Sequence, residues 1–157
     1  IMLKIYKAFI LPHFYYCSCV WHFCSIRNSE KLEALNKRIL KVIFNDYSST
    51  YNQLLDKAGT ISLNTQRIYS MLINVFKSLH FDGYPNYLKT MITLRTSKYS
   101  LRGTNILTLP KPNTTTYGLS SFQYFAAKTW NSLPESIRTE SSFNEFKNKL
   151  LTFLKLY

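Results

Sequence analysis

Five side chains near the N-terminus are of types that bind zinc or act as nucleophiles. They are His13, Cys17, Cys19, His22 and Cys24. Zinc modules use closely paired ligands such as Cys-x-x-Cys, and this segment contains no such pair. No carboxylate or carboxamide within it would orient a histidine beside a nucleophilic cysteine. Small cysteines between aromatic residues are typical of packed cores, which is the role we expect here, with a zinc site as the alternative.

The eight carboxylates are scattered along the chain, whereas a two-metal polymerase or nuclease centre needs clustered acids. Only Glu30 and Glu33 are expected to share a helix face, and the lysines beside them indicate surface ion pairs. The chain also lacks a glycine-rich phosphate loop. We therefore predict no catalytic residue, no metal ligand and no cofactor in this chain.

Cations dominate the charge. The 20 lysines and arginines outnumber the acids and give a net charge of +12. Residues 83–134 contribute six cations and no carboxylate, so these cations have little internal pairing and favour an external polyanion such as nucleic acid. Tyr99, Tyr117 and Tyr124 are interleaved with them, a pattern suited to base stacking. The alternative is a solvated basic surface with the tyrosines in the core.

Helical elements are predicted over most of the first half. Residues 2–25 have helical spacing that Pro12 kinks or restarts. Ser29 is the predicted N-cap of the next helix. Thr50 and Gln53 form a capping box for a short helix that Gly59 closes, and Ser62 begins a long one that ends near Leu79. The apolar stripe expected on the second helix comprises Leu32, Leu35, Ile39, Val42 and Ile43.

The second half mixes short helices with loops. Residues 85–92 and 121–131 favour helices, and Ser142 begins the last one. Residues 93–120 are rich in Thr, Ser, Asn and Pro, which indicates loops with a small β-hairpin or ribbon. Large aromatic side chains favour core positions. The predicted core anchors are Tyr16, Trp21 and Trp130.

The N-terminal third of the sequence indicates the cellular compartment and whether the chain contacts a membrane. Three cysteines within eight residues do not form a disulfide framework, so we expect a reducing intracellular setting. Residues 8–26 lack formal charge over 19 positions, close to the length of a membrane span. Pro12, two histidines and many aromatic residues interrupt that stretch, so a buried helix is favoured and no membrane contact is expected. The chain lacks an initiator Met and begins within a helical pattern, so we expect a part of a longer polypeptide.

A series of short motifs then resembles one family. Residues 6–14 (YKAFILPHF), followed by Tyr16-Cys17-Ser18 and Val20-Trp21, resemble a block just downstream of the polymerase palm in non-LTR (LINE-type, jockey-like) retrotransposon reverse transcriptases. The remaining matches follow in the family's order and together cover essentially the whole chain. They are residues 31–33 (KLE) through 41–44 (KVIF), 82–88 (DGYPNYL), 109–112 (LPKP), 117–118 (YG), 121–122 (SF), 126–134 (AAKTWNSLP) and 143–147 (FNEFK).

The resemblance implies the thumb and post-polymerase C-terminal region of such an enzyme. Members of the family copy RNA into DNA at a nicked target, using magnesium held by palm aspartates, but this chain has no Asp-Asp pair and no endonuclease domain. The implied role is non-catalytic: gripping the RNA and DNA of the template–primer. The implied partners are nucleic acid and the rest of the parent polymerase. The implied location is the nucleus, with a cytoplasmic ribonucleoprotein stage.

The predicted fold is mainly α. It comprises a thumb-like helical bundle over residues 1–82, a basic loop or β-ribbon over 83–120, and C-terminal helices over 121–157 that pack back on the bundle. The predicted nucleic-acid-binding residues are Lys37, Arg38, Lys41, Arg67, Lys98, Arg102, Lys111 and Lys128. Two other hypotheses stay open. One is a decayed or domesticated structural fragment that packs on a partner or on the missing palm, marked by an exposed apolar patch on the first helix. The other is a membrane-surface module.

Overall fold

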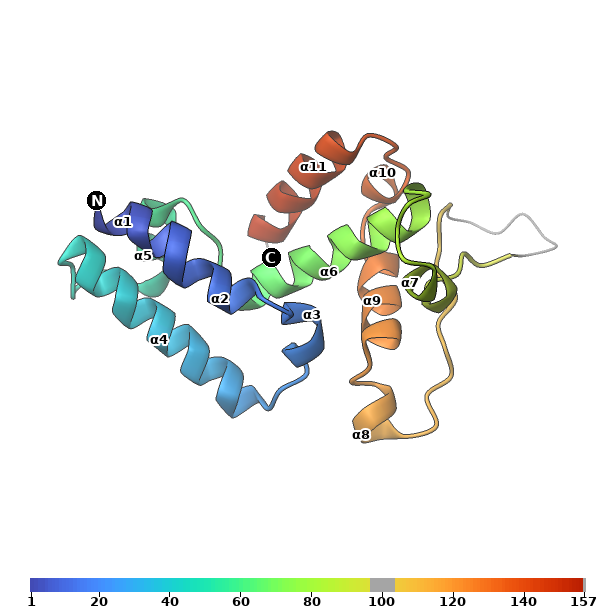
Figure 1. Cartoon of the computed structure of the whole chain (residues 1–157), viewed down its shortest axis with the longest axis horizontal. Coiled ribbons are helices and arrows are strands. Elements are labelled where there is room, and N and C mark those ends of the chain that lie inside the picture. Colours follow the sequence, from blue (N-terminus) through green and yellow to red (C-terminus); the bar gives the residue numbers. More distant parts are fainter. Residues whose placement is uncertain (97–103, 157) are drawn as a thin grey trace. The chain divides into compact units, whose positions relative to one another are not determined.

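The protein is mainly helical, as predicted, and forms two compact units (Figure 1). The computed structural model describes residues 1–96 and 104–156. The first unit comprises Ile1–Ile68 and the second Tyr69–Tyr157, so the boundary falls within a helix, α6 (Leu63–His80). The division predicted from the sequence, with segments at 1–82, 83–120 and 121–157, stays a prediction.

Pro12 shapes the first helical segment. The chain forms α1 (Met2–Ile5), a π-helical turn η1 (Tyr6–Ile10) and α2 (Leu11–Tyr15), followed by α3 (Ser18–Trp21). Proline has no N–H and its ring clashes with the carbonyl four residues earlier, so a regular α-helix cannot pass through Pro12. The wider π turn precedes the proline, and Leu11 donates to the Tyr6 carbonyl five residues back. The predicted restart at Pro12 is thereby confirmed.

Two helices complete most of the first unit. Helix α4 (Ile26–Phe44) begins after Ser25, whose hydroxyl accepts a hydrogen bond from the Asn28 backbone N–H. The predicted N-cap Ser29 was therefore wrong by four residues. Helix α5 (Tyr51–Ala58) has the predicted capping box of Thr50 and Gln53. It ends at Gly59 in the left-handed conformation (φ 62°), which glycine adopts without a steric cost.

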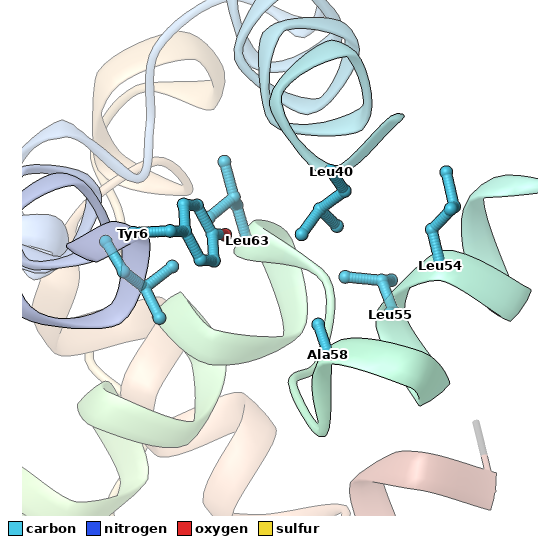
Figure 2. Close-up of a cluster of buried hydrophobic side chains, with 7 residues drawn as sticks. Tyr6, Leu40, Leu54, Leu55, Ala58 and Leu63 are labelled. Atoms are coloured by element: carbon cyan, nitrogen blue, oxygen red, sulfur yellow. The ribbon is translucent and has the colours of Figure 1, made fainter. Parts of the chain in front are cut away.

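The core of the first unit gathers aliphatic side chains from α4, α5 and the start of α6 around Tyr6 (Figure 2). The predicted α4 stripe was partly wrong, because Leu35 and Val42 are exposed. Asn36, which was not part of the predicted stripe, lies on the inward face of α4 and is fully buried. The buried hydrophobic residues of this cluster are Tyr6, Leu11, Leu40, Leu54, Leu55, Ala58 and Leu63.

A chain of hydrogen bonds explains the buried asparagine. The Tyr6 hydroxyl donates to Asn36 Oδ1 at 2.6 Å, and Asn36 Nδ2 donates to the Tyr51 hydroxyl at 2.8 Å. Tyr51 donates in turn to Glu33 Oε2 at 2.6 Å. The Glu33 carboxylate also accepts the backbone N–H groups of Leu63 and Asn64, at the start of α6. Glu33 is thus a capping group for α6, and the prediction that it forms a surface ion pair was wrong.

The second unit is built around an aromatic cluster. Phe76 of α6 stacks on Phe146 of α11 (Phe143–Leu156) with ring centroids 4.3 Å apart. Trp130 of α9 (Phe122–Asn131) lies 5.7 Å from the same ring and is fully buried, so its predicted role as a core anchor is confirmed. The remaining helices of this unit are α7 (Asn86–Met91), α8 (Thr115–Gly118) and α10 (Glu135–Arg138).

No β-hairpin forms among the described residues of segment 93–120. A single antiparallel bridge joins Leu94 to Leu107 instead. On the other side of Leu107, the Asn131 side chain bonds both of its backbone groups. The Leu107 N–H donates to Asn131 Oδ1 at 2.8 Å, and Asn131 Nδ2 donates to the Leu107 carbonyl at 2.9 Å. A side-chain amide therefore occupies the edge that a further strand would need.

The other two predicted core anchors differ from expectation. Trp21 is half-buried and its indole N–H donates to the Tyr16 carbonyl at 2.8 Å. Tyr16 itself is 77% exposed, so its predicted core position was wrong. Within residues 1–96 and 104–156, no helix is long and apolar enough to cross a membrane.

Candidate nucleic-acid interface

Helix α4 brings three of the predicted binding residues together. Lys37 and Lys41 are four residues apart and Arg38 lies between them, so successive turns place all three on neighbouring positions. The opposite face of the same turns is anchored by Asn36 and Leu40, both fully buried. The buried face therefore fixes the rotation of the helix about its axis and directs these three cations, the α4 cation group, away from the core.

These cations line one shallow cavity of about 430 Å³. Its remaining walls are Ala34 and Tyr47, so none of the lining residues is acidic. Arg38 is exposed and Lys37 is half-exposed. Among the described residues neither side chain has a hydrogen bond or ion pair. Three like charges at close range repel one another, and a polyanion relieves that repulsion.

Tyr47 belongs to this site although it is not among the binding residues predicted from the sequence. Helix α4 ends at Asn45 in the left-handed conformation (φ 48°), and the chain turns back beside the helix. Lys41 Nζ donates to the Tyr47 carbonyl at 3.1 Å, which ties the turn to the α4 cation group. The signal was present in the sequence, since Asn45-Asp46-Tyr47-Ser48-Ser49 has turn composition and an aromatic side chain within a turn is usually exposed.

Asp46 holds this turn in shape. Its Oδ1 accepts the backbone N–H groups of Ser48 and Ser49 at 3.2 and 3.0 Å. Its Oδ2 accepts from the Ser49 hydroxyl and forms an ion pair with Lys57 of α5. The hydrogen bonds from Lys57 and from Ser49 hold the pKa of the Asp46 carboxyl well below its usual range. The Asp46 carboxylate is thus paired with Lys57 rather than with a member of the α4 cation group.

Arg67 has a different environment. It is only 1% exposed, and its Nη2 donates to the Ser29 hydroxyl and to Asn64 Oδ1 at 2.6 and 3.1 Å. The guanidinium lies over the Trp21 ring, 4.9 Å from the ring centroid. Its Nε and Nη1 have no hydrogen-bond partner among the described residues, and Arg67 lines a separate cavity with Ser29, Glu33 and Asn64 rather than the cavity of the α4 cation group. We therefore assign Arg67 to the packing of the first unit and remove it from the candidate interface.

The other predicted cations lie beyond the first unit. Lys111, in the loop before α8, and Lys128, on α9, are exposed and have no hydrogen bond or ion pair within the described residues. Lys98 and Arg102 lie outside the described residues. The structure thus gathers Lys37, Arg38 and Lys41 into one site, and it shows that Lys111 and Lys128 are exposed.

No group of three histidine, cysteine or carboxylate side chains with metal-binding geometry occurs in the described part of the chain. Cys17 is exposed, and Cys19 and Cys24 are half-buried, so the three cysteines do not form the fully packed cluster that was expected. The pKa of His22 is lowered by burial and by the nearby Arg67 charge, which favours a neutral imidazole.

No protein family, curated protein or solved structure matches this chain.

Proposed function

We propose that this chain is a non-catalytic nucleic-acid-binding part of a reverse transcriptase of the non-LTR retrotransposon type. In this proposal it grips the backbone of an RNA–DNA template–primer, while the polymerase chemistry and its magnesium belong to a palm in the parent protein. The proposed setting is the nucleus, with a cytoplasmic ribonucleoprotein stage. The sequence motifs supply the family, and the helical fold accords with a thumb.

One observation carries the binding part of the proposal. The α4 cation group lines a single cavity without an acidic residue, and Lys37 and Arg38 have no ion-pair partner among the described residues. Lysine and arginine contacts to phosphate oxygens fix the position of a nucleic acid without reading its sequence. The site therefore suits backbone binding, and we expect little dependence of affinity on base sequence.

A charge-matched pair of variants tests this proposal. The first combines Lys37→Gln, Arg38→Gln and Lys41→Gln, and the second combines Lys4→Gln, Arg27→Gln and Lys31→Gln, three exposed cations of the same unit. Binding of a fluorescein-labelled RNA–DNA duplex is followed by anisotropy at one fixed salt concentration. We expect the first variant to weaken binding by about tenfold or more and the second by much less, because only the first removes phosphate contacts. Equal losses for the two variants would show that net charge alone is responsible.

A second function is favoured by a separate observation. Met2, Ile5 and Phe9 follow one another at helical spacing on the outer side of α1 and η1, and Phe9 is 70% exposed. Such a row on a first helix is the mark of a fragment that packs on a partner protein or on the missing palm. The same anisotropy titration separates the two functions, since a packing fragment shows no affinity for nucleic acid.

A further inference from the structure

The α4 cation group lies beside an exposed aromatic side chain. Tyr47 lines the same cavity as Lys37, Arg38 and Lys41, and 65% of its surface is exposed. Burying an aromatic ring is one of the larger stabilising contributions available to a small unit, so an exposed ring at a basic site calls for an explanation. The combination of cations and an aromatic face is typical of sites that bind single-stranded nucleic acid.

The backbone of the turn that carries Tyr47 is held in place by several bonds. Asp46 bonds the backbone of Ser48 and Ser49 on one side, and Lys41 bonds the Tyr47 carbonyl on the other. Lys57 ties Asp46 to α5, so the turn is held from both flanking helices. A binding group that is already ordered loses less conformational entropy when its ligand arrives.

A duplex makes poor use of such a ring. Its bases are already stacked on their neighbours, so apart from the duplex ends their faces are not open to a further ring. An unpaired nucleotide offers both a phosphate and a free base face. The cavity volume of about 430 Å³ lies in the range of small-ligand sites, about 300–1,000 Å³. A cavity of this size has room for one nucleotide.

Resting on the function proposed above, we propose that this cavity binds an unpaired nucleotide at the edge of a template–primer duplex. The α4 cation group contacts its phosphate, and the Tyr47 ring stacks on its base. The side chains of Lys37, Arg38 and Lys41 can only donate hydrogen bonds. They therefore do not distinguish one base from another by its particular arrangement of donors and acceptors. We therefore expect it to accept any of the four bases, because every base has a face for stacking.

The test compares two probes of the same RNA–DNA duplex, one with flush ends and one with a short single-stranded overhang that carries 2-aminopurine. We expect the full chain to bind the overhang probe more tightly than the flush probe, by about tenfold, a factor within the range of one base stacked on an aromatic ring. The 2-aminopurine fluorescence is expected to fall on binding. The variant Tyr47→Ala should abolish both the preference and the quenching, whereas Tyr47→Phe should keep them.

Tyr87 provides the matched control, because it is also 65% exposed and lies on α7 in the second unit. Tyr87→Ala should leave the overhang preference unchanged. If the full chain binds both probes equally, or if Tyr47→Ala keeps the preference, this inference is overturned while duplex binding by the α4 cation group stands. If neither probe binds, the proposed function fails together with the inference.

Discussion

Asn36 is the residue on which the buried polar network of the first unit depends. Its amide links the Tyr6 and Tyr51 hydroxyls. The Tyr51 hydroxyl donates in turn to the Glu33 carboxylate, which accepts a backbone N–H at the start of α6. Each buried polar group in this network has a hydrogen-bond partner. Removing one partner would leave the other group buried without a hydrogen bond, which lowers the free energy of unfolding. The network therefore joins η1, α4, α5 and the start of α6 through directional bonds rather than through apolar contact alone.

Truncation of this amide should destabilise the protein. In Asn36→Ala the Tyr6 hydroxyl loses its acceptor and the Tyr51 hydroxyl loses its donor, which should cost about 2–3 kcal/mol of unfolding free energy. Urea denaturation followed by circular dichroism measures the loss. Asn28→Ala on the exposed face of the same helix is the control, with an expected change below about 0.5 kcal/mol. Similar losses at the two positions would contradict the network's role.

The same residues predict a weakness at alkaline pH. Burial raises the pKa of Tyr6 to about 12 from an ordinary value of 10.0, and burial also raises the pKa of Tyr51. Because the folded state keeps these phenols protonated, their contribution to stability is complete below pH 10. It is lost as the pH rises from about 10 toward 12, where the unfolded chain releases its protons first.

The unfolding free energy should therefore fall over that interval, and Tyr6→Phe should make the fall shallower because one titrating group is gone. Denaturation curves at a series of pH values give the slope, and tyrosinate absorbance reports ionisation directly. An identical slope for the wild-type chain and Tyr6→Phe would show that Tyr6 titrates normally.

At this scale, sequence reasoning succeeded where the partner is local. The bond between Thr50 and Gln53 spans three residues, and its pattern is visible in the sequence. It failed where the partner is distant, since Glu33 meets the N-terminus of α6 about thirty positions away. Asn36 was missed for the same reason, because a polar residue on an inward face becomes acceptable only when the fold supplies its partners.

Among the elements, the segment before α9 shows how a helix side chain bonds the outer edge of a short stretch of strand pairing. Within the segment 93–120, for which a small β-hairpin or ribbon was predicted, residues 93–95 and 106–108 do approach each other, with two backbone hydrogen bonds of 2.8 and 2.9 Å. The pairing is a single bridge among the described residues, and Asn131 bonds the backbone groups of Leu107 on the opposite edge. Composition identified the segment and its loop character, but the capture of Leu107 by a helix side chain required the tertiary structure.

Replacement of the Asn131 amide by a carboxylate tests this arrangement. Asn131→Asp keeps the acceptor for the Leu107 N–H but sets a second oxygen against the Leu107 carbonyl. The lost bond and the repulsion should cost about 2 kcal/mol or more, seen as a lower midpoint of thermal unfolding. Asn144→Asp in the exposed first turn of α11 is the control, and it should be neutral or slightly stabilising because acids favour helix N-termini. A neutral result at Asn131 would mean that the amide does not hold the loop.

On the scale of the whole molecule, the sequence correctly predicted a mainly helical chain. It predicted the α4 cation group, because three cations at helical spacing share a face whatever the tertiary fold. It could not foresee that Arg67 is enclosed by Ser29, Asn64 and Trp21, or that Tyr47 returns beside the cations. Both depend on contacts between elements, which no local pattern encodes.

The central claim is that the α4 cation group binds the phosphate backbone. Its most direct test is the salt dependence of RNA–DNA duplex binding for the wild-type chain and for the variant that combines Lys37→Gln, Arg38→Gln and Lys41→Gln. Each neutralised phosphate contributes about 0.7–0.9 to the slope of log K against log salt concentration. We predict a steep negative slope for the wild-type chain and a slope shallower by about two to three for the variant. A flat plot for the wild-type chain, or parallel lines for the two proteins, would contradict the claim.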